Sequence, residues 1–87
     1  MSTPFIVYSK PNCSYCDQAK ALLASKNLSY EELILDAGQV KVDGKKYVTV
    51  QQLREVVPAA TTVPQILKDG MLIGGFTQLK TRLLINA

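Results

Sequence analysis

Short apolar runs alternate with an amphipathic segment along the first third of the chain. Residues 4–8 form a run of strand-forming side chains that ends in a Pro-Asn turn signal, and residues 29–35 form a similar run. Between them, apolar side chains recur at helical spacing over residues 14–26, with Asn12 as the expected N-cap and Asn27 as the stop. This pattern predicts a strand, a helix and a second strand, which implies a parallel pair joined by a right-handed crossover.

The second half of the chain predicts a helix, a hairpin and a last helix. A capping-box pattern that begins at Thr49 predicts a helix through Val57. Strands are predicted over residues 65–68 and 71–73, and the Asp-Gly turn signal between them makes the pair antiparallel. Two consecutive glycines then allow a sharp turn into a helix that starts at Phe76 and carries apolar residues on one face.

These elements follow the order β-α-β-α-β-β-α, with a parallel first half and an antiparallel second half. The order predicts the thioredoxin fold, an α/β fold in which three helices flank a four-stranded mixed sheet. Residues 36–47 fit either a hairpin around Asp43-Gly44 or a mobile loop. Because 87 residues do not provide a second hydrophobic core, we expect one domain over residues 1–87.

Composition and charge narrow the classes of function. The chain is 47% apolar and 20% charged, which is typical of an ordinary globular protein. Its net charge of +3 comes from basic residues spread from Lys10 to Arg82, whereas nucleic-acid binding needs a concentrated basic face. The N-terminus lacks the pattern of a secretory signal, and no apolar stretch approaches the roughly 20 residues of a membrane span. We therefore expect a cytoplasmic protein with no membrane or nucleic-acid partner.

The two cysteines, Cys13 and Cys16, form a Cys-x-x-Cys motif where the first predicted helix begins. A closed zinc site requires four ligands, and a chain with no histidine and no further cysteine does not supply them. A structural disulfide is disfavoured, because its loop is short and the cytosol keeps such bonds reduced. A chance pair is the remaining alternative, and a redox site is the favoured interpretation.

The positions of the two cysteines predict different roles. Unpaired N–H groups and the positive end of the helix dipole favour a thiolate at Cys13, and Lys10 adds a positive charge nearby. We expect Cys13 to be the nucleophile, with a lowered thiol pKa. Cys16 lies one turn further along the same helical face, so we expect it to be more buried and to resolve a mixed disulfide on Cys13.

Beyond the cysteines, the sequence resembles the glutaredoxin family over essentially its full length. The resemblance rests on the short length and on three motifs: Lys10-Pro11-x-Cys13-x-Tyr15-Cys16, Thr62-Val63-Pro64 and Gly74-Gly75. It implies a monomeric, glutathione-dependent thiol–disulfide oxidoreductase that reduces protein disulfides and glutathione mixed disulfides and needs no bound cofactor. The compact form looks most like phage or bacterial glutaredoxins, which commonly serve ribonucleotide reductase.

The resemblance also implies a glutathione site. Pro64 would be a cis-proline facing the cysteines, which leaves the Val63 backbone free to pair with the cysteinyl part of glutathione. Beyond Gly75, the N–H groups of Phe76 and Thr77 would receive the γ-glutamyl carboxylate at a helix start. The other residues implied to bind the tripeptide are Lys10, Tyr15, Gln51 and Thr62, with Lys10 and Gln51 at the glycyl carboxylate.

Two departures from the family pattern keep alternatives open. Ser14 stands where many members have proline, and Thr77 stands where an aspartate usually pairs with the γ-glutamyl ammonium. The first departure allows an alternative function, a dimer in which Cys13 of two chains and two glutathiones hold a [2Fe–2S] cluster. A small thioredoxin is a further alternative, although the tryptophan usual before its first cysteine is missing here.

Overall fold

Five strands and three helices form between residues 4 and 85, the part of the chain that the computed structural model describes. The strands are β1 (Phe5–Ser9), β2 (Tyr30–Leu35), β3 (Lys46–Val48), β4 (Gln65–Lys68) and β5 (Met71–Gly74). The helices are α1 (Ser14–Ser25), α2 (Val50–Val56) and α3 (Phe76–Ile85). The predicted domain also includes residues 1–3 and 86–87, which lie outside the described residues.

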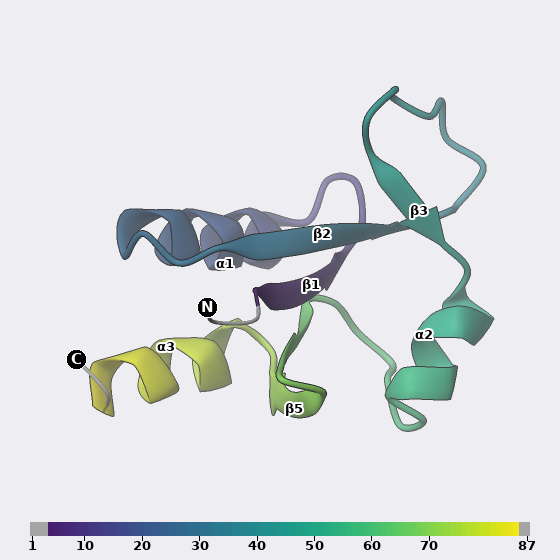
Figure 1. Cartoon of the computed structure of the whole chain (residues 1–87). Coiled ribbons are helices and arrows are strands. Elements are labelled where there is room, and N and C mark those ends of the chain that lie inside the picture. The colour runs from purple at the N-terminus through teal and green to yellow at the C-terminus, as the bar shows by residue number, and fades with distance from the viewer. Residues whose placement is uncertain (1–3, 86–87) are drawn as a thin grey trace.

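The strands form one mixed sheet in the order β3-β2-β1-β4-β5 (Figure 1). β1 pairs in parallel with β2 across α1, and antiparallel with β4, where Val7 lies opposite Ile66. β4 and β5 form the predicted hairpin, and Asp69 and Gly70 at its turn have φ values of 55° and 77°, as a type I′ turn requires. The arrangement is that of the predicted thioredoxin fold.

The sheet also has a fifth strand, so the predicted number of four was too low. β3 pairs in parallel with β2 at the edge of the sheet, with Tyr47 opposite Ile34. Residues 40–42 form no strand, so the hairpin considered around Asp43-Gly44 does not form. Residues 36–45 instead make the long connection that two parallel neighbouring strands require. A strand of three residues is too short to show a period of two in the sequence.

The connection over residues 36–45 is fixed to the sheet by hydrogen bonds. The Tyr47 hydroxyl on β3 accepts a hydrogen bond from the Val42 N–H at 2.8 Å. Gln39 donates from its side-chain amide to the Leu35 carbonyl at the end of β2, at 3.0 Å. The segment therefore has defined contacts at both ends, which the alternative of a mobile loop did not anticipate.

Side chains of β1 contribute to both faces of the sheet, because successive residues of a strand point to opposite sides. The buried core on the side of α1 and α3 consists of Phe5, Val7, Ala19, Leu23, Ile66 and Leu79. The buried core on the side of α2 consists of Tyr8, Leu53, Val57, Ala60 and Leu67. Helices therefore cover both faces of β1, which explains why its sequence is a continuous apolar run.

Helix α1 has a different N-cap from the one predicted. Asn12 has a φ of 57°, a left-handed conformation in which a residue does not serve as an N-cap. Cys13, with φ −115° and ψ 102°, is the N-cap, and its Sγ accepts a hydrogen bond from the Cys16 N–H. At the other end, the helix stops at Ser25, and Asn27 follows with a φ of 57°, in agreement with the predicted stop.

Helix α2 begins at the predicted capping box. The Thr49 hydroxyl accepts a hydrogen bond from the Gln52 N–H at 3.0 Å, and the Gln52 side-chain oxygen accepts one from the Thr49 N–H at 2.8 Å. Two N–H groups at the helix start are thereby satisfied reciprocally. The helix ends at Val56, one residue before the predicted end.

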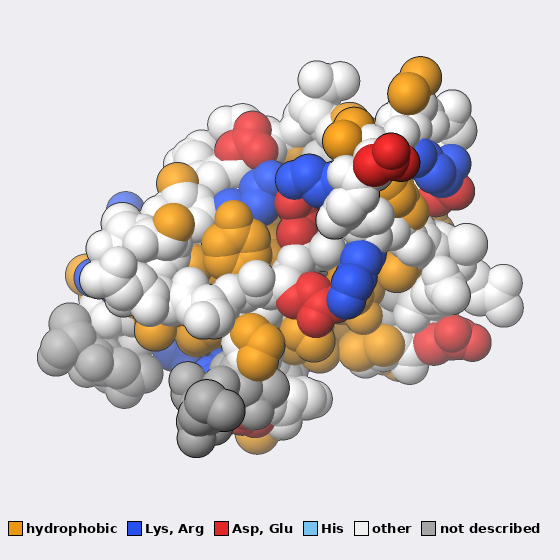
Figure 2. Space-filling view, turned by 45° about the horizontal axis from the view of Figure 1, so that its top comes forward, with side chains coloured by type: hydrophobic (Ala, Val, Ile, Leu, Met, Phe, Trp, Pro, Cys, Tyr) orange, Lys and Arg blue, Asp and Glu red, His pale blue; other side chains and the backbone are white. Residues whose placement is uncertain are grey.

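The charge on the surface is dispersed. On the face shown in Figure 2, Lys and Arg side chains are scattered among acidic and apolar ones. This face therefore lacks the concentrated basic surface that nucleic-acid binding requires. Among the helices between residues 4 and 85, none has the length and apolar character needed to cross a membrane.

One ion-pair network joins β1, α1 and β2. The Glu32 carboxylate on β2 accepts hydrogen bonds from the buried Ser9 hydroxyl at 2.7 Å and from the Lys20 ammonium at 2.8 Å, and Lys45 Nζ lies 3.7 Å away. Burial alone would raise the pKa of Glu32. The hydrogen bonds from Lys20 and Ser9, with the charges of Lys20 and Lys45, outweigh burial and hold this pKa below its ordinary value of 4.5.

The network makes stability depend on pH in the acid range. Because the pKa of Glu32 is lower in the folded chain than in the unfolded chain, its stabilisation is complete above pH 4.5 and is lost as pH falls through the folded value. We expect Glu32→Gln to lower the free energy of unfolding by about 1 to 3 kcal/mol at neutral pH, since two charge-assisted hydrogen bonds are weakened. The variant should also lose less stability than the wild type between about pH 5 and about pH 2.

Urea unfolding at neutral and acid pH measures both effects. Glu31→Gln is the matched control, because Glu31 is the neighbour on β2 and its pair with Lys46 is more exposed. Such exposed pairs contribute about 0 to 1 kcal/mol. If the Glu32 variant and the wild type lost the same stability in acid, Glu32 would not be the group responsible.

Candidate active site

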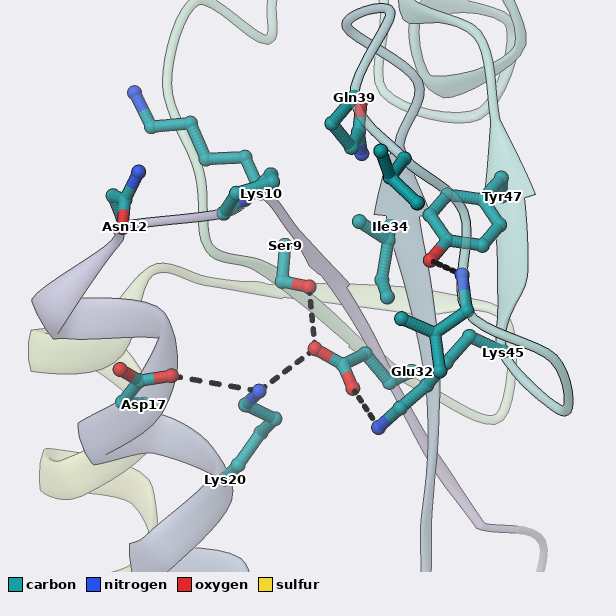
Figure 3. A pocket seen from close by; sticks show the side chains of 13 residues that line it. Ser9, Lys10, Asn12, Asp17, Lys20, Glu32, Ile34, Gln39, Lys45 and Tyr47 are labelled. Carbon is teal, nitrogen blue, oxygen red and sulfur yellow. Dashed lines mark hydrogen bonds and ion pairs between the residues drawn. The ribbon is translucent and has the colours of Figure 1, made fainter.

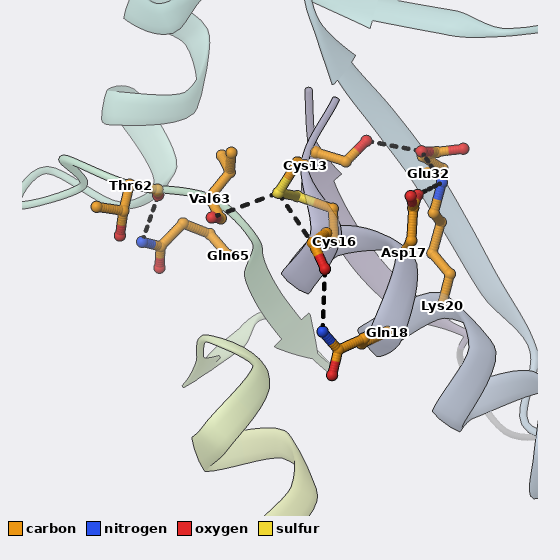
Figure 4. The surroundings of a disulfide bond; sticks show 11 residues. Cys13, Cys16, Asp17, Gln18, Lys20, Glu32, Thr62, Val63 and Gln65 are labelled. Carbon is orange, nitrogen blue, oxygen red and sulfur yellow. Dashed lines mark hydrogen bonds and ion pairs between the residues drawn. A yellow bond between two sulfur atoms is a disulfide. The ribbon is translucent and has the colours of Figure 1, made fainter. Parts of the chain in front are cut away.

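Cys13 and Cys16 are joined by a disulfide at the start of α1 (Figure 4). Their Cα atoms lie 5.2 Å apart. Cys13 is 8% exposed and Cys16 is 1% exposed, so the Cys13 sulfur is the more accessible of the two. The deeper position of Cys16 is the one expected from its place one helical turn further on.

The Cys13 sulfur occupies the point where the N–H groups of the first turn of α1 are directed. The Cys16 N–H donates to it at 3.2 Å, and the Asp17 N–H donates to the Cys13 carbonyl at 3.1 Å. N–H groups at a helix start carry partial positive charge, which stabilises an anion there. The local geometry therefore favours a thiolate on Cys13 after reduction.

The segment that precedes β4 reaches Cys13 from the neighbouring part of the sheet. The Val63–Pro64 peptide bond is cis, as the resemblance implied. The Val63 carbonyl oxygen lies 3.8 Å from the Cys13 sulfur, and Pro64 is buried. Thr62 is exposed, and its carbonyl accepts a hydrogen bond from the Gln65 side chain at 2.8 Å. Residues 50 positions apart in the sequence thus meet at the disulfide.

An aromatic pair lies at the start of α1 and α3. Tyr15 is 61% exposed, and its ring centroid lies 6.0 Å from that of Phe76, with the ring planes tilted by 32°. Tyr15 is therefore not part of the buried core. The two rings form an accessible apolar surface next to the Cys-x-x-Cys motif.

The turn into α3 depends on Gly74 and on the side chain of Gln78. Gly74 has a φ of 125°, and a Cβ there would come 2.9 Å from Gln78 Cγ. The Gly75 N–H donates to Gln78 Oε1 at 2.9 Å. The N–H groups of Phe76 and Thr77 lie in the first turn, where the helix itself provides no acceptor. Thr77 is exposed.

The sequence analysis gave Gln78 no role. Its position three residues after Gly75 is the position from which a glutamine caps the start of a helix. That spacing is the signal that could have identified it.

A hollow of about 170 Å³ lies on the α2 side of Val63. Its lining includes three residues that the family resemblance implied to bind glutathione, namely Lys10, Thr62 and Val63. Gln51 does not line it and is exposed on α2. The other lining residues are Leu35, Val50, Leu53, Arg54, Ala60 and Thr61.

Arg54 is the basic residue of α2 at this hollow, and the sequence analysis missed it. Its Nε donates to the Ala60 carbonyl at 3.2 Å, which fixes the guanidinium near the hollow. Val50, Leu53 and Arg54 line the hollow from one face of the helix. Helical spacing of three and four residues, counted forward from Val50, places Leu53 and Arg54 on that face and leaves Gln51 off it.

Comparison with known proteins identifies the family. The profile of the family described as Glutaredoxin matches residues 5–73, well over half of the chain. This chain belongs to the glutaredoxin family.

Relatives of this glutaredoxin support the assignment. Glutaredoxin 3 of Escherichia coli (strain K12) is 39% identical over 75 residues, which cover 84% of this chain and 77% of that protein. The hybrid peroxiredoxin hyPrx5 of Haemophilus influenzae is 40% identical over 76 residues, which cover 85% of this chain and 27% of that protein. The holo form of glutaredoxin C1 from Populus tremula x tremuloides superposes with a TM-score of 0.73 at 30% identity, over 98% of this chain and 71% of that chain.

As a dithiol glutaredoxin, the protein is a thiol–disulfide oxidoreductase with a redox-active Cys13–Cys16 pair. The predicted enzyme class, family and fold are confirmed. The family match also sets aside the alternative of a small thioredoxin.

We predict that the Cys13 thiol of the reduced protein has a pKa below the free-cysteine value of about 8.5, because the α1 N–H groups stabilise the anion. Cys16→Ser leaves Cys13 as the only thiol and keeps the residue 16 N–H. Thiolate absorbance titrated against pH in this variant therefore reports the pKa of Cys13 alone. A value at or above 8.5 would contradict the proposed effect of the helix start.

Proposed function

We propose that this glutaredoxin uses glutathione to reduce glutathione mixed disulfides and protein disulfides. The observation that carries the proposal is the arrangement around Cys13. Cys13 is the less buried of the two cysteines, its sulfur lies beside the Val63 carbonyl, and Lys10 and Arg54 are among the residues that line the adjoining hollow. A backbone edge next to a reactive sulfur and two basic side chains suits a thiol tripeptide with a terminal carboxylate.

The reaction with a glutathione mixed disulfide requires one cysteine. The Cys13 thiolate attacks the glutathione sulfur, a new Cys13–glutathione disulfide forms, and the protein thiolate leaves. A second glutathione thiolate then attacks the glutathione sulfur of that disulfide. Oxidised glutathione forms, and the Cys13 thiolate is released. One glutathione thiol is oxidised, as it joins the glutathione unit already present in the mixed disulfide, and one protein thiol is restored.

The reaction with an intramolecular protein disulfide requires both cysteines. Cys13 attacks one client sulfur and forms a mixed disulfide, and the other client sulfur leaves as a thiolate. The Cys16 thiolate then attacks Cys13 Sγ, which releases the reduced client and forms the Cys13–Cys16 disulfide. Two glutathiones reduce this disulfide and leave as oxidised glutathione. The 1% exposure of Cys16 suits a thiol that reacts only within the protein.

The surroundings of Cys13 support a position for each part of glutathione. The Val63 backbone would pair with the cysteinyl part. Beyond Gly75, the N–H groups of Phe76 and Thr77 would bind the γ-glutamyl carboxylate at the start of α3. Lys10 would bind the glycyl carboxylate, and Arg54 is better placed than Gln51 to assist it. The remaining contacts in the proposal come from Tyr15, Thr62 and the cis-proline Pro64.

We further propose that the protein acts as a cytoplasmic monomer, with ribonucleotide reductase as a candidate client. The resemblance to compact phage and bacterial glutaredoxins supports this proposal. The alternative of a [2Fe–2S] dimer would use one cysteine ligand, Cys13, from each chain. We favour dithiol exchange over cluster binding, because Cys13 and Cys16 form the disulfide that such exchange produces.

An NADPH-coupled assay tests the source of electrons. The purified protein is assayed on hydroxyethyl disulfide with one of two electron sources, either glutathione and glutathione reductase or thioredoxin reductase alone. We expect NADPH oxidation with the first system and background rates with the second. The opposite result would contradict glutathione dependence.

Single-cysteine variants test the two roles. We expect Cys13→Ser to abolish all exchange, because no accessible thiolate remains. We expect Cys16→Ser to keep most of the activity on a glutathione mixed disulfide and to lose at least about tenfold on a peptide with an intramolecular disulfide, because glutathione replaces the resolving thiol only in the first case. Full activity of the Cys16 variant on the peptide disulfide would show that Cys16 does not resolve.

A further inference from the structure

A second hollow, of about 500 Å³, lies between α1, β2 and the loop over residues 36–45 (Figure 3). It is separate from the hollow beside Val63, and Lys10 lines both. Pro11 and Asn12 also line it, so one end of the hollow reaches the residues directly before Cys13. We call this second hollow the client groove.

The acidic side chains of the client groove have ion-pair partners within the protein. The Glu32 carboxylate accepts hydrogen bonds from Ser9 and Lys20, and Lys45 lies 3.7 Å from its second oxygen. Asp17 lies 3.5 Å from the same Lys20 ammonium. Glu32 is therefore occupied by internal partners, whereas Asp17 shares Lys20 with it and keeps a side chain that is 76% exposed.

One wall of the groove is apolar and exposed. Ile34 and Tyr47 are half-buried, whereas Val40 is 90% exposed and Val42 is 59% exposed. The side chains of Val40 and Val42 are too exposed to contribute much to the stability of the fold. Their presence in one loop leaves an apolar surface available for contact with another molecule.

Polar contacts hold this wall in place. The Val42 N–H donates to the Tyr47 hydroxyl at 2.8 Å. Lys41 Nζ lies 3.1 Å from Asp36 Oδ1 and 5.8 Å from the centroid of the Tyr47 ring. A surface that is fixed before binding loses less conformational entropy when a partner docks.

Basic side chains stand at the edge of the groove. Lys10 is exposed and has no ion-pair partner among residues 4–85, and Figure 3 shows its ammonium directed away from Glu32. Lys45 has a side chain 52% exposed, and its 3.7 Å contact is to a carboxylate that Ser9 and Lys20 already bind. Both ammonium groups are therefore available to negative charge on a partner.

We propose that the client groove binds the polypeptide segment next to the disulfide of a client protein, and that it favours segments with both acidic and apolar side chains. The groove begins at Lys10–Asn12, so a client sulfur that reaches Cys13 brings its flanking residues over the groove. The basic edge and the valine wall are complementary to acidic and apolar side chains. The inference rests on the proposed function, because it specifies the protein substrates of the same reaction.

Two synthetic peptides test the selectivity. Each carries the same intramolecular disulfide, with Asp and Leu on both flanks in one peptide and Lys and Leu in the other. In the glutathione-coupled assay, we expect kcat/KM to be about three- to tenfold higher for the acidic peptide at low ionic strength, with a smaller difference at high salt. Equal values for the two peptides at low salt would overturn the proposal.

Variants locate the selectivity. Val40→Asp and Lys45→Glu add negative charge to the wall and to the edge, and neither residue has a part in the proposed chemistry. We expect each to lower kcat/KM for the acidic peptide toward the value for the basic peptide, with hydroxyethyl disulfide turnover unchanged. Met71→Asp is the matched control, because Met71 is 71% exposed on β5 and does not line the groove.

Three other results have defined meanings. A preference for the acidic peptide that survives both groove variants would overturn the proposal, because neither the valine wall nor the edge at Lys45 would then contribute to the selectivity. An equal loss in Met71→Asp would also overturn it, because the effect would then come from overall charge. Failure of the wild-type protein to reduce hydroxyethyl disulfide with glutathione would instead contradict the proposed function, and this result is separate from any comparison of the peptides.

Discussion

The position of β1 between β2 and β4 is the constraint on which the active site depends. β1 runs parallel to β2 and antiparallel to β4. The carboxyl-terminal ends of β1 and β2 therefore lie beside the amino-terminal end of β4, at the same end of the sheet. Cys13 follows β1, Val63 precedes β4, and the loop over residues 36–45 follows β2. Cores on both faces hold β1 in this position. One set of strand pairings therefore places the disulfide, the cis-proline segment and the client groove together.

Much of this fold could be predicted from the sequence because its signals are local. The apolar run of β1, the capping box at Thr49 and the Asp69-Gly70 turn each define an element by themselves. The edge strand β3 has only three residues, and a connection over residues 36–45 separates it from its partner β2. No local pattern in the sequence therefore marks it. The N-cap was misplaced because asparagine is a common N-cap, and its left-handed φ is not visible in the sequence.

The residues of the Cys-x-x-Cys motif and of the family motifs could be predicted from the sequence. Side chains that only the folded chain brings together were harder to predict. The motif alone indicated that Cys16 is deeper than Cys13, and the resemblance placed Val63 and Pro64 beside them. The facing side of a short helix is harder to assign, and Arg54 was overlooked for that reason. The client groove combines residues of β1, α1, β2 and the 36–45 loop. Its lysines lie far apart in the sequence, and only the folded chain brings them to the same groove.

The use of a cysteine sulfur as the N-cap of α1 links the folding of this protein to its oxidising power. The Cys16 N–H binds a Cys13 thiolate more strongly than a disulfide sulfur, because a charged acceptor makes the stronger hydrogen bond. This contact therefore stabilises the reduced form more than the oxidised form, and a dithiol with a stabilised reduced form is a stronger oxidant.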